Sequence, residues 1–233
     1  MSMIQANGLT FSYPGSPDPV FQDAAFQIDT SWRLGLVGRN GRGKTTLLRL
    51  LMGEFPHQGT LTASGPFDYF PRPVPDPDRL TAEVLEDLCP DAENWRFPRE
   101  LGLLGVEEEA LWRPFSTLSN GERTKVLLAA LFLREGAFPL IDEPTNHLDA
   151  QGRALAAAYL RRQRGFILVS HDRHFLDGCV DHILSFNRAD IQVQAGNYSS
   201  WKENFDRVQQ FEEAKNDRLR KDIRRLQQAA RRT

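Results

Sequence analysis

The sequence predicts an α/β protein built around a mostly parallel sheet. Three short apolar runs carry this prediction: residues 34–37, 138–141 and 166–169. Runs of this length and composition are typical of central strands, which are buried on both faces of a parallel sheet. Segments with helical spacing separate them, as the crossover connections between parallel strands require. Because ligands of such sheets bind beyond the carboxyl ends of the strands, the residues after each run form the candidate site.

In chain order, the first 70 residues predict mainly β structure. One helix, over 45–52, interrupts a series of short β-like runs: 4–11, 25–28, 34–37, 60–62 and 67–70. A proline-rich stretch at 71–77 then ends regular structure, because each proline fixes φ and removes a backbone donor. Residues 80–115 have helical spacing but are broken by three prolines, which predicts a small helical subdomain.

The second half of the chain alternates helical and β-like segments. In order, these are helix 121–133, strand 138–141, helix 151–162, strand 166–169, a short helix near 173–177, and β-like runs 183–186 and 191–194. From Ser199 onward the chain is predicted to be helical to its end, because its apolar residues recur at three-and-four spacing. The members of this seam are Phe205, Val208, Phe211, Leu219, Ile223 and Leu226.

Length and composition exclude several classes of protein. The 233 residues, 40% of them hydrophobic, suffice for one large domain or two small ones. No apolar run reaches the roughly 18 residues of a membrane span, and residues 1–30 lack the blocks of a signal peptide. Cys89 and Cys179 are far apart and belong to no CxxC pair, so neither a zinc site nor a disulfide framework is indicated. We expect a soluble cytoplasmic protein that contacts no membrane by itself.

The formal net charge of -2 conceals a basic end. Residues 215–233 contain eight basic and two acidic side chains, whereas the rest of the chain is net acidic. Two interpretations remain open for the basic run: a polyanionic partner near the end of the chain, or the solvated face of a helix.

Residues 38–45, Gly-Arg-Asn-Gly-Arg-Gly-Lys-Thr, fit the phosphate-binding P-loop pattern between a strand and a helix. Glycines let backbone N–H groups converge on phosphate oxygens, Lys44 would reach the terminal phosphates, and the Thr45 hydroxyl would bind Mg²⁺. The candidate nucleotide-binding residues here are Gly38, Asn40, Gly41, Gly43, Lys44, Thr45 and Thr46. The alternative is a glycine-rich turn with an exposed lysine.

Two adjacent acids, Asp142 and Glu143, follow the run 138–141. Alternate residues at the end of a strand point to opposite faces, so Asp142 could hold the metal through water while Glu143 polarises an attacking water. The alternative is a pair of acids that caps the next helix. His171 follows the run 166–169 and could contact the terminal phosphate, although a lone histidine is more often structural.

The segment Leu118-Ser119-Asn120-Gly121-Glu122 predicts a helix start with a second anion site. Ser119 can cap the helix and Gly121 permits close backbone approach. By itself the segment is equally consistent with an ordinary helix N-terminus.

Together these motifs resemble the ATP-binding cassette (ABC) superfamily over about residues 3–195. Residues 38–45 resemble its Walker A loop, 118–122 its signature, 138–143 its Walker B strand, 146–149 its D-loop, and His171 its switch histidine. The resemblance implies a P-loop NTPase of the ABC-ATPase fold, with an antiparallel β subdomain and a small helical subdomain, that binds ATP and Mg²⁺. It also implies that Tyr13 stacks on adenine, unless Tyr13 is a core strand aromatic, and that Ser119, Gly121, Glu122 and Asp149 contact nucleotide across a cassette pair.

The pattern fails at the family's glutamine loop. After Tyr69-Phe70-Pro71 the metal-contacting glutamine is replaced by Arg72, and an arginine cannot ligate Mg²⁺. We expect either that water replaces this ligand or that the site hydrolyses ATP slowly.

Residues 144–149, 196–201 and the helix after them are similar to the ABC-F group, which has two cassettes joined by a helical linker and acts on ribosomes. This implies a nucleotide-binding domain over 1–198 with a helical subdomain at about 73–134, and the start of the linker at 199–233. It further implies a second cassette beyond this chain, a ribosome partner (rRNA and tRNA) for the basic run, and weak ATPase activity of the chain alone. The segment 67–71 and Arg72 are similar to the antibiotic-resistance branch. The rivals are a transporter's ATPase subunit and an ATP-gated module that does not hydrolyse.

Overall fold

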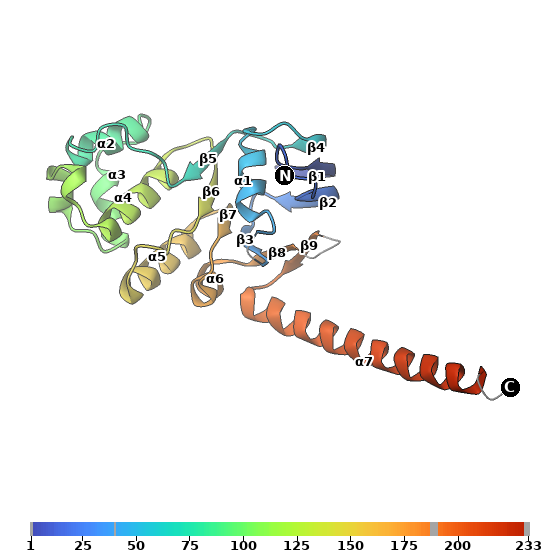
Figure 1. Cartoon of the computed structure of the whole chain (residues 1–233). Helices are drawn as coiled ribbons and strands as arrows, with labels where there is room; N and C mark the ends of the chain where they lie inside the picture. The colour runs from blue at the N-terminus through green and yellow to red at the C-terminus, as the bar shows by residue number, and fades with distance from the viewer. Residues whose placement is uncertain (1, 40, 187–190, 231–233) are drawn as a thin grey trace.

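The computed structural model describes residues 2–39, 41–186 and 191–230, the side chains of 216–218 and 221–230 excepted. Two sheets lie side by side, a group of short helices extends from one of them, and a long helix projects from the body (Figure 1).

The larger sheet has six strands in the order β5-β6-β7-β3-β8-β9. Its strands are β3 (Arg33–Val37), β5 (Phe67–Phe70), β6 (Phe138–Asp142), β7 (Phe166–Val169), β8 (His182–Phe186) and β9 (Ile191–Ala195). Neighbours pair in parallel except β8 and β9, which are antiparallel. The mostly parallel core predicted from the three apolar runs is therefore confirmed, and those runs occupy three adjacent strands, β6, β7 and β3.

The smaller sheet is antiparallel, with the order β2-β1-β4. It contains β1 (Met3–Phe11), β2 (Phe21–Asp29) and β4 (Gln58–Thr62). Helix α1 (Lys44–Leu51) packs between the two sheets, because its leucines share one buried cluster with Ile4 and Ile28 from the small sheet and Leu140 from the large one. This packing holds the amino end of α1 directly after β3.

The other face of the large sheet is covered by α4 (Asn120–Leu133), α5 (Ala150–Arg162) and α6 (Arg173–Cys179). The helical subdomain consists of α2 (Thr81–Leu88), α3 (Arg96–Leu103) and two short 3-10 helices, η1 (Glu108–Trp112) and η2 (Phe115–Thr117). Its apolar residues continue into the same buried cluster as α4, so the subdomain and the sheet share one core.

The long helix α7 spans Tyr198–Ala230 and begins one residue before the predicted start. Its first turn is anchored, since Tyr198 and Trp201 pack against the core. Farther along, Val208 and Phe211 of the predicted seam are 58% and 72% exposed, while the side chains of Ile223 and Leu226 lie outside the described residues. In the described part of the chain, no helix is both long enough and apolar enough to cross a membrane.

Candidate nucleotide site

The loop between β3 and α1 ends at Lys44, which is the first residue of α1. Gly43 precedes α1 at φ 92°, in the left-handed region, and a Cβ there would lie 2.5 Å from Val20 Cγ1. Lys44 is 8% exposed, and its Nζ donates to the carbonyl oxygen of Gly38 at 2.9 Å. Burial lowers the pKa of Lys44, opposed by the charges of Glu143 and Asp142. The ammonium is therefore turned into the loop, where the P-loop pattern places phosphates.

The metal candidates Thr45 and Asp142 meet across 97 residues of sequence. The Thr45 hydroxyl donates to Asp142 Oδ2 at 2.9 Å, and the Tyr69 hydroxyl donates to the same oxygen at 3.0 Å. A hydroxyl and a carboxylate are hard oxygen donors, and Mg²⁺ commonly takes one or two such ligands together with substrate phosphates. A metal held by Thr45 and Asp142 would take its remaining ligands from phosphate oxygens and water.

Glu143 stands beside this pair in a strained and partly buried position. Its φ of 49° lies in the left-handed region, which is unusual for a non-glycine residue. Its Oε2 accepts from the backbone N–H of His171 at 3.3 Å, and His171 Nε2 lies 3.2 Å from Oε1 without hydrogen-bond geometry. Burial raises the pKa of Glu143, and the His171 charge opposes that rise. A carboxylate with a raised pKa is suited to accept a proton from water.

The acids do not cap the following helix, which answers the alternative left open by the sequence. Helix α5 is capped by Asp149, whose Oδ1 accepts from Gly152 N at 2.7 Å. Asp142 and Glu143 instead line a cavity of about 330 Å³ at the ends of β5 and β6. The cavity is lined by Thr45, Tyr69, Phe70, Pro71, Thr124, Asp142, Glu143, Pro144, Asn146 and His147.

Tyr13 lies after the end of β1 and is 38% exposed, so it is not a buried core aromatic. Its hydroxyl is 2.8 Å from the Thr46 hydroxyl, and its ring meets Phe11 and Phe55 edge-on at 5.1 Å and 5.6 Å between centroids. The structure thus connects two of the predicted nucleotide residues, Tyr13 and Thr46, and leaves part of an aromatic ring accessible beside the P-loop helix.

The predicted signature forms a complete helix cap. Glu122 N donates to the Ser119 hydroxyl at 3.2 Å, and Ser119 N donates to Glu122 Oε2 at 2.7 Å. These bonds lower the pKa of Glu122. A Cβ on Gly121 would come within 3.2 Å of the carbonyl oxygen of His147, so this helix start packs closely on the loop that follows Glu143. Glu122 shapes the helix terminus in this chain, because its carboxylate is already engaged.

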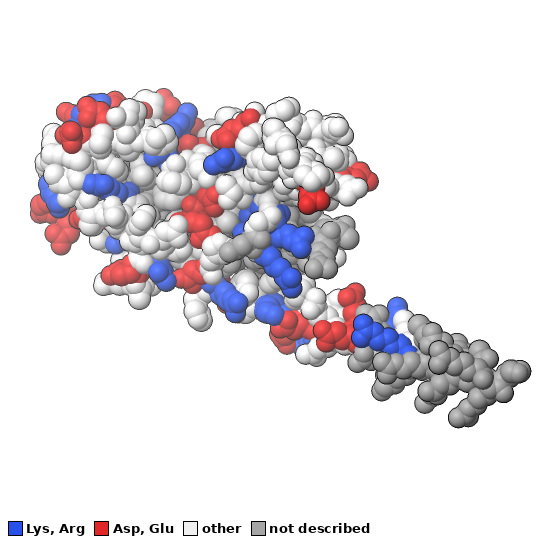
Figure 2. All heavy atoms as spheres, viewed as in Figure 1, with Lys and Arg blue, Asp and Glu red and all other residues white. Residues whose placement is uncertain are grey.

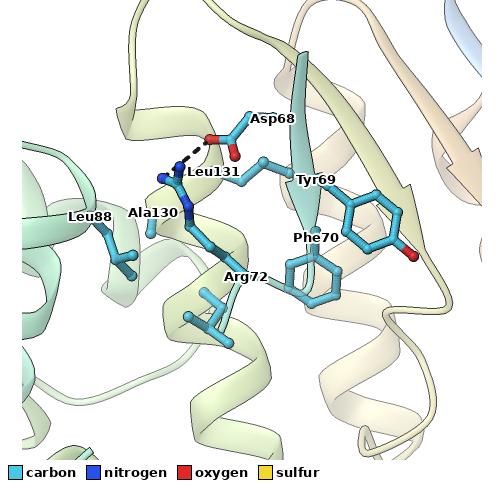
Figure 3. A pocket seen from close by; sticks show the side chains of 8 residues that line it. Asp68, Tyr69, Phe70, Arg72, Leu88, Ala130 and Leu131 are labelled. Carbon is cyan, nitrogen blue, oxygen red and sulfur yellow. Dashed lines mark ion pairs between the residues drawn. The ribbon is translucent and has the colours of Figure 1, made fainter. Parts of the chain in front are cut away.

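Arg72 and Tyr69 extend to opposite sides of β5, as Figure 3 shows. Its guanidinium pairs with Asp68 at 3.8 Å, and Arg134 pairs with the same carboxylate at 3.6 Å. Tyr69, not Arg72, extends to the side of β5 on which Asp142 lies. The side chain at position 72 therefore belongs to an ion-pair cluster around the buried carboxylate of Asp68. Whether water replaces the glutamine ligand or hydrolysis is slow stays a prediction.

Sequence reasoning missed Tyr69, although strand register contains the signal. Tyr69 pairs with Leu140 in the parallel β5-β6 ladder, and Leu140 and Asp142 are two residues apart and so share a face. Of the predicted residues, Asn40 lies outside the described part of the chain. The side chain of Thr45 contacts Asp142, and that of Glu143 contacts His171. Asp149 and Ser119 cap helices.

Comparison with known proteins identifies the family of the chain that carries this site. Residues 21–146 match the family described as ABC transporter. The chain is 31% identical over 207 residues to ABC transporter F family member 3 of Arabidopsis thaliana, a match that covers 86% of the chain and 29% of that protein. It is 32% identical over 216 residues to the energy-dependent translational throttle protein EttA of Haemophilus influenzae, covering 86% of the chain and 38% of that protein.

A solved structure of a bacterial Atm1-family ABC exporter with ATP bound has a TM-score of 0.71 at 16% identity, and the likeness covers 87% of the chain and 40% of the exporter. At this identity the likeness supports the fold alone. The chain spans less than two fifths of the length of the two curated relatives. The family match extends over more than half of the chain, and F-family relatives align with most of it. The chain therefore belongs to the ABC family of P-loop ATPase domains and, within it, to the ABC-F subfamily.

Proposed function

We propose that this chain is the Mg-ATP-binding cassette of an ABC-F protein that acts on ribosomes. The observation that carries the nucleotide part is the Thr45 to Asp142 hydrogen bond of 2.9 Å, beside a lysine turned into the P-loop. A hydroxyl and an ammonium from the start of α1 and a carboxylate from the end of β6 converge where strands β3 and β6 end. Such convergence is what binding a metal-chelated phosphate requires.

Each residue has a distinct task in this proposal. Lys44 and the loop N–H groups bind phosphate oxygens, while Thr45 and Asp142 hold Mg²⁺, which when bound neutralises charge on the phosphates. Glu143 accepts a proton from the attacking water, for which its raised pKa suits it. His171, 59% exposed beside Glu143, orients toward the terminal phosphate. We expect hydrolysis to require the Ser119 and Gly121 segment of a second cassette, so the chain alone hydrolyses weakly.

The ribosome part of the proposal has separate support. One relative is named a translational throttle protein, and the described face of α7 carries both acidic and basic side chains that extend from the body (Figure 2). Residues 1–198 would be the nucleotide-binding domain and 199–233 the start of the linker, whose basic residues would lie against RNA phosphates. Of that basic run, Lys215 and Arg220 are described; the side chains of Arg218, Lys221, Arg224, Arg225, Arg231 and Arg232 are not. Protection of the ribosome against antibiotics is the most specific part of the proposal and rests on the similarity at 67–72.

The test uses the complete protein that contains this chain. A Glu143→Gln variant should lose ATPase activity, bind ATP, and co-sediment with ribosomes in the presence of ATP more strongly than wild type, because the closed nucleotide-bound state persists. Glu135→Gln, at a carboxylate whose side chain is 73% exposed, is the matched control and should behave as wild type. If the protein pellets with membranes and not with ribosomes, the result would favour a transporter subunit. Equal ATPase rates of wild type and Glu143→Gln would indicate a module that does not hydrolyse ATP at this site. Unchanged antibiotic susceptibility on expression would refute the protection role alone.

A further inference from the structure

Tyr69 is a half-buried phenol beside the metal candidates, and the proposed function assigns it no task. Its hydroxyl donates to Asp142 Oδ2 at 3.0 Å, and it also lines the 330 Å³ cavity. Thr45 donates to the same oxygen at 2.9 Å. The Asp142 carboxylate is therefore held from two directions, by β5 through Tyr69 and by α1 through Thr45.

The backbone makes this contact a stable feature of the sheet. Tyr69 and Leu140 are register partners in parallel strands, and Asp142 follows Leu140 by two residues on the same face. Side chains in strands lean along the strand direction, so a long side chain at position 69 reaches the carboxylate at position 142. A shorter side chain at position 69 would not span this offset.

The phenol is a donor at physiological pH. A tyrosine hydroxyl keeps its proton at this pH, because its ordinary pKa is about 10. Arg72, which follows β5 by two residues, is directed to Asp68 on the other side of the strand (Figure 3). A neutral hydroxyl thus contacts the carboxylate from β5, and it leaves the negative charge of Asp142 available for a metal.

We infer that Tyr69 is a positioning residue for the magnesium site, which fixes the orientation of the Asp142 carboxylate and through it the Thr45 hydroxyl. This inference rests on the proposed function. Partners that orient metal ligands typically change metal affinity by about 10–100-fold when they are removed. We expect about tenfold here, at the lower end of that range, because Thr45 still holds the carboxylate when the phenol is lost.

The test is Tyr69→Phe, which keeps the ring and its packing and removes only the hydroxyl. Mn²⁺ serves as the probe: its binding to the ATP-loaded protein is measured by electron paramagnetic resonance, and ATP binding is measured separately in EDTA. Tyr69→Phe should raise the Mn²⁺ dissociation constant about tenfold and leave ATP binding in EDTA unchanged. Tyr198→Phe, at the start of α7, is the matched control and should change neither.

A spectroscopic measurement on wild type keeps the inference testable even if the variant folds poorly. The chain has four tyrosines, so ring-labelled tyrosine gives a resolvable spectrum, and Tyr69 is identified as the resonance that remains when each of the other three tyrosines is replaced by phenylalanine in turn. Mn²⁺ should broaden this resonance more than those of Tyr159 and Tyr198. Absence of metal-dependent binding in wild type would overturn the proposed function. Equal Mn²⁺ affinity of wild type and Tyr69→Phe, or a Tyr69 resonance untouched by Mn²⁺, would overturn this inference alone.

Discussion

Replacing Glu143 with glutamine should stabilise the folded protein at neutral pH, although the same change should abolish hydrolysis. The carboxylate is buried enough that its pKa is raised despite the attraction of His171 and Lys44. Its Oε1 has no hydrogen-bond partner. The negative charge is therefore a net cost to the native state, and a neutral amide of the same shape removes it.

The magnitude follows from the burial of that oxygen. A buried polar atom without a partner costs about 1–3 kcal/mol, more when it is charged. The Glu143 side chain retains 20% exposure, and glutamine leaves a polar oxygen in the same place, so we expect a gain at the lower end. A gain of about 1 kcal/mol corresponds to a rise in Tm of about 2–4 °C for a domain of this size.

The expected stabilisation depends on pH, which distinguishes it from a simple packing effect. Because the pKa of Glu143 is raised on folding, wild type loses stability as the pH rises through the folded-state value, so the advantage of Glu143→Gln is full at pH 8 and shrinks toward pH 5. Glu122 is the matched control, since its pKa is lowered by its bonds to Ser119. Glu122→Gln should therefore lower stability at neutral pH, by about 0.5 kcal/mol, and this loss should fade only in acid. Thermal denaturation of both variants from pH 5 to pH 8 decides: a lower Tm for Glu143→Gln at pH 8 would refute the reasoning.

Two further variants test the surroundings of the site. Asp68→Ala removes a carboxylate that is 5% exposed and paired with two arginines. Because those arginines are more than a third exposed and can be solvated again, the free energy of unfolding in urea should fall by only about 1–2 kcal/mol. A fall below about 0.5 kcal/mol would contradict the ion-pair cluster. Gly43→Ala combines a φ of 92° with a Cβ placed 2.5 Å from Val20, so fluorescent-nucleotide binding should be lost, whereas Gly41→Ala, at φ 76° with no atom within 4 Å, should retain more of it. Equal binding by the two glycine variants would show that strain, and not the clash, controls the loop.

The elements of the fold could be predicted because their signals are local. The strand at Phe166–Val169 was predicted with the same bounds, and the P-loop helix within one residue, since apolar runs and a glycine-rich loop act within a few neighbouring residues. The resemblance predicts that Asp149 contacts nucleotide across a cassette pair, and this stays a prediction; within this chain Asp149 caps α5. A sequence motif does not distinguish an acid that binds a ligand from an acid that caps a helix, because both precede helix N-termini.

The contacts of the site that join distant segments could not be predicted in this way. Arg72 was identified from the sequence as a departure from the family pattern, but the cluster in which Arg72 and Arg134 both pair with Asp68 depends on how β5 packs against the end of α4. The φ of Glu143 and the direction of its pKa shift likewise depend on the residues that surround it after folding.

The sequence by itself determined the family, the P-loop and the positions of the two acids, because these depend on residue type and short spacing. The tertiary structure alone decided that Tyr69 holds Asp142, that Arg72 turns to the opposite side of β5, and that Asp149 and not the acidic pair caps α5. The physical reason is strand register. Alternation along β5 and its alignment with β6 decide whether a side chain in β5 faces the metal site or the helical core. That alignment exists only when the 67 residues between the two strands have packed.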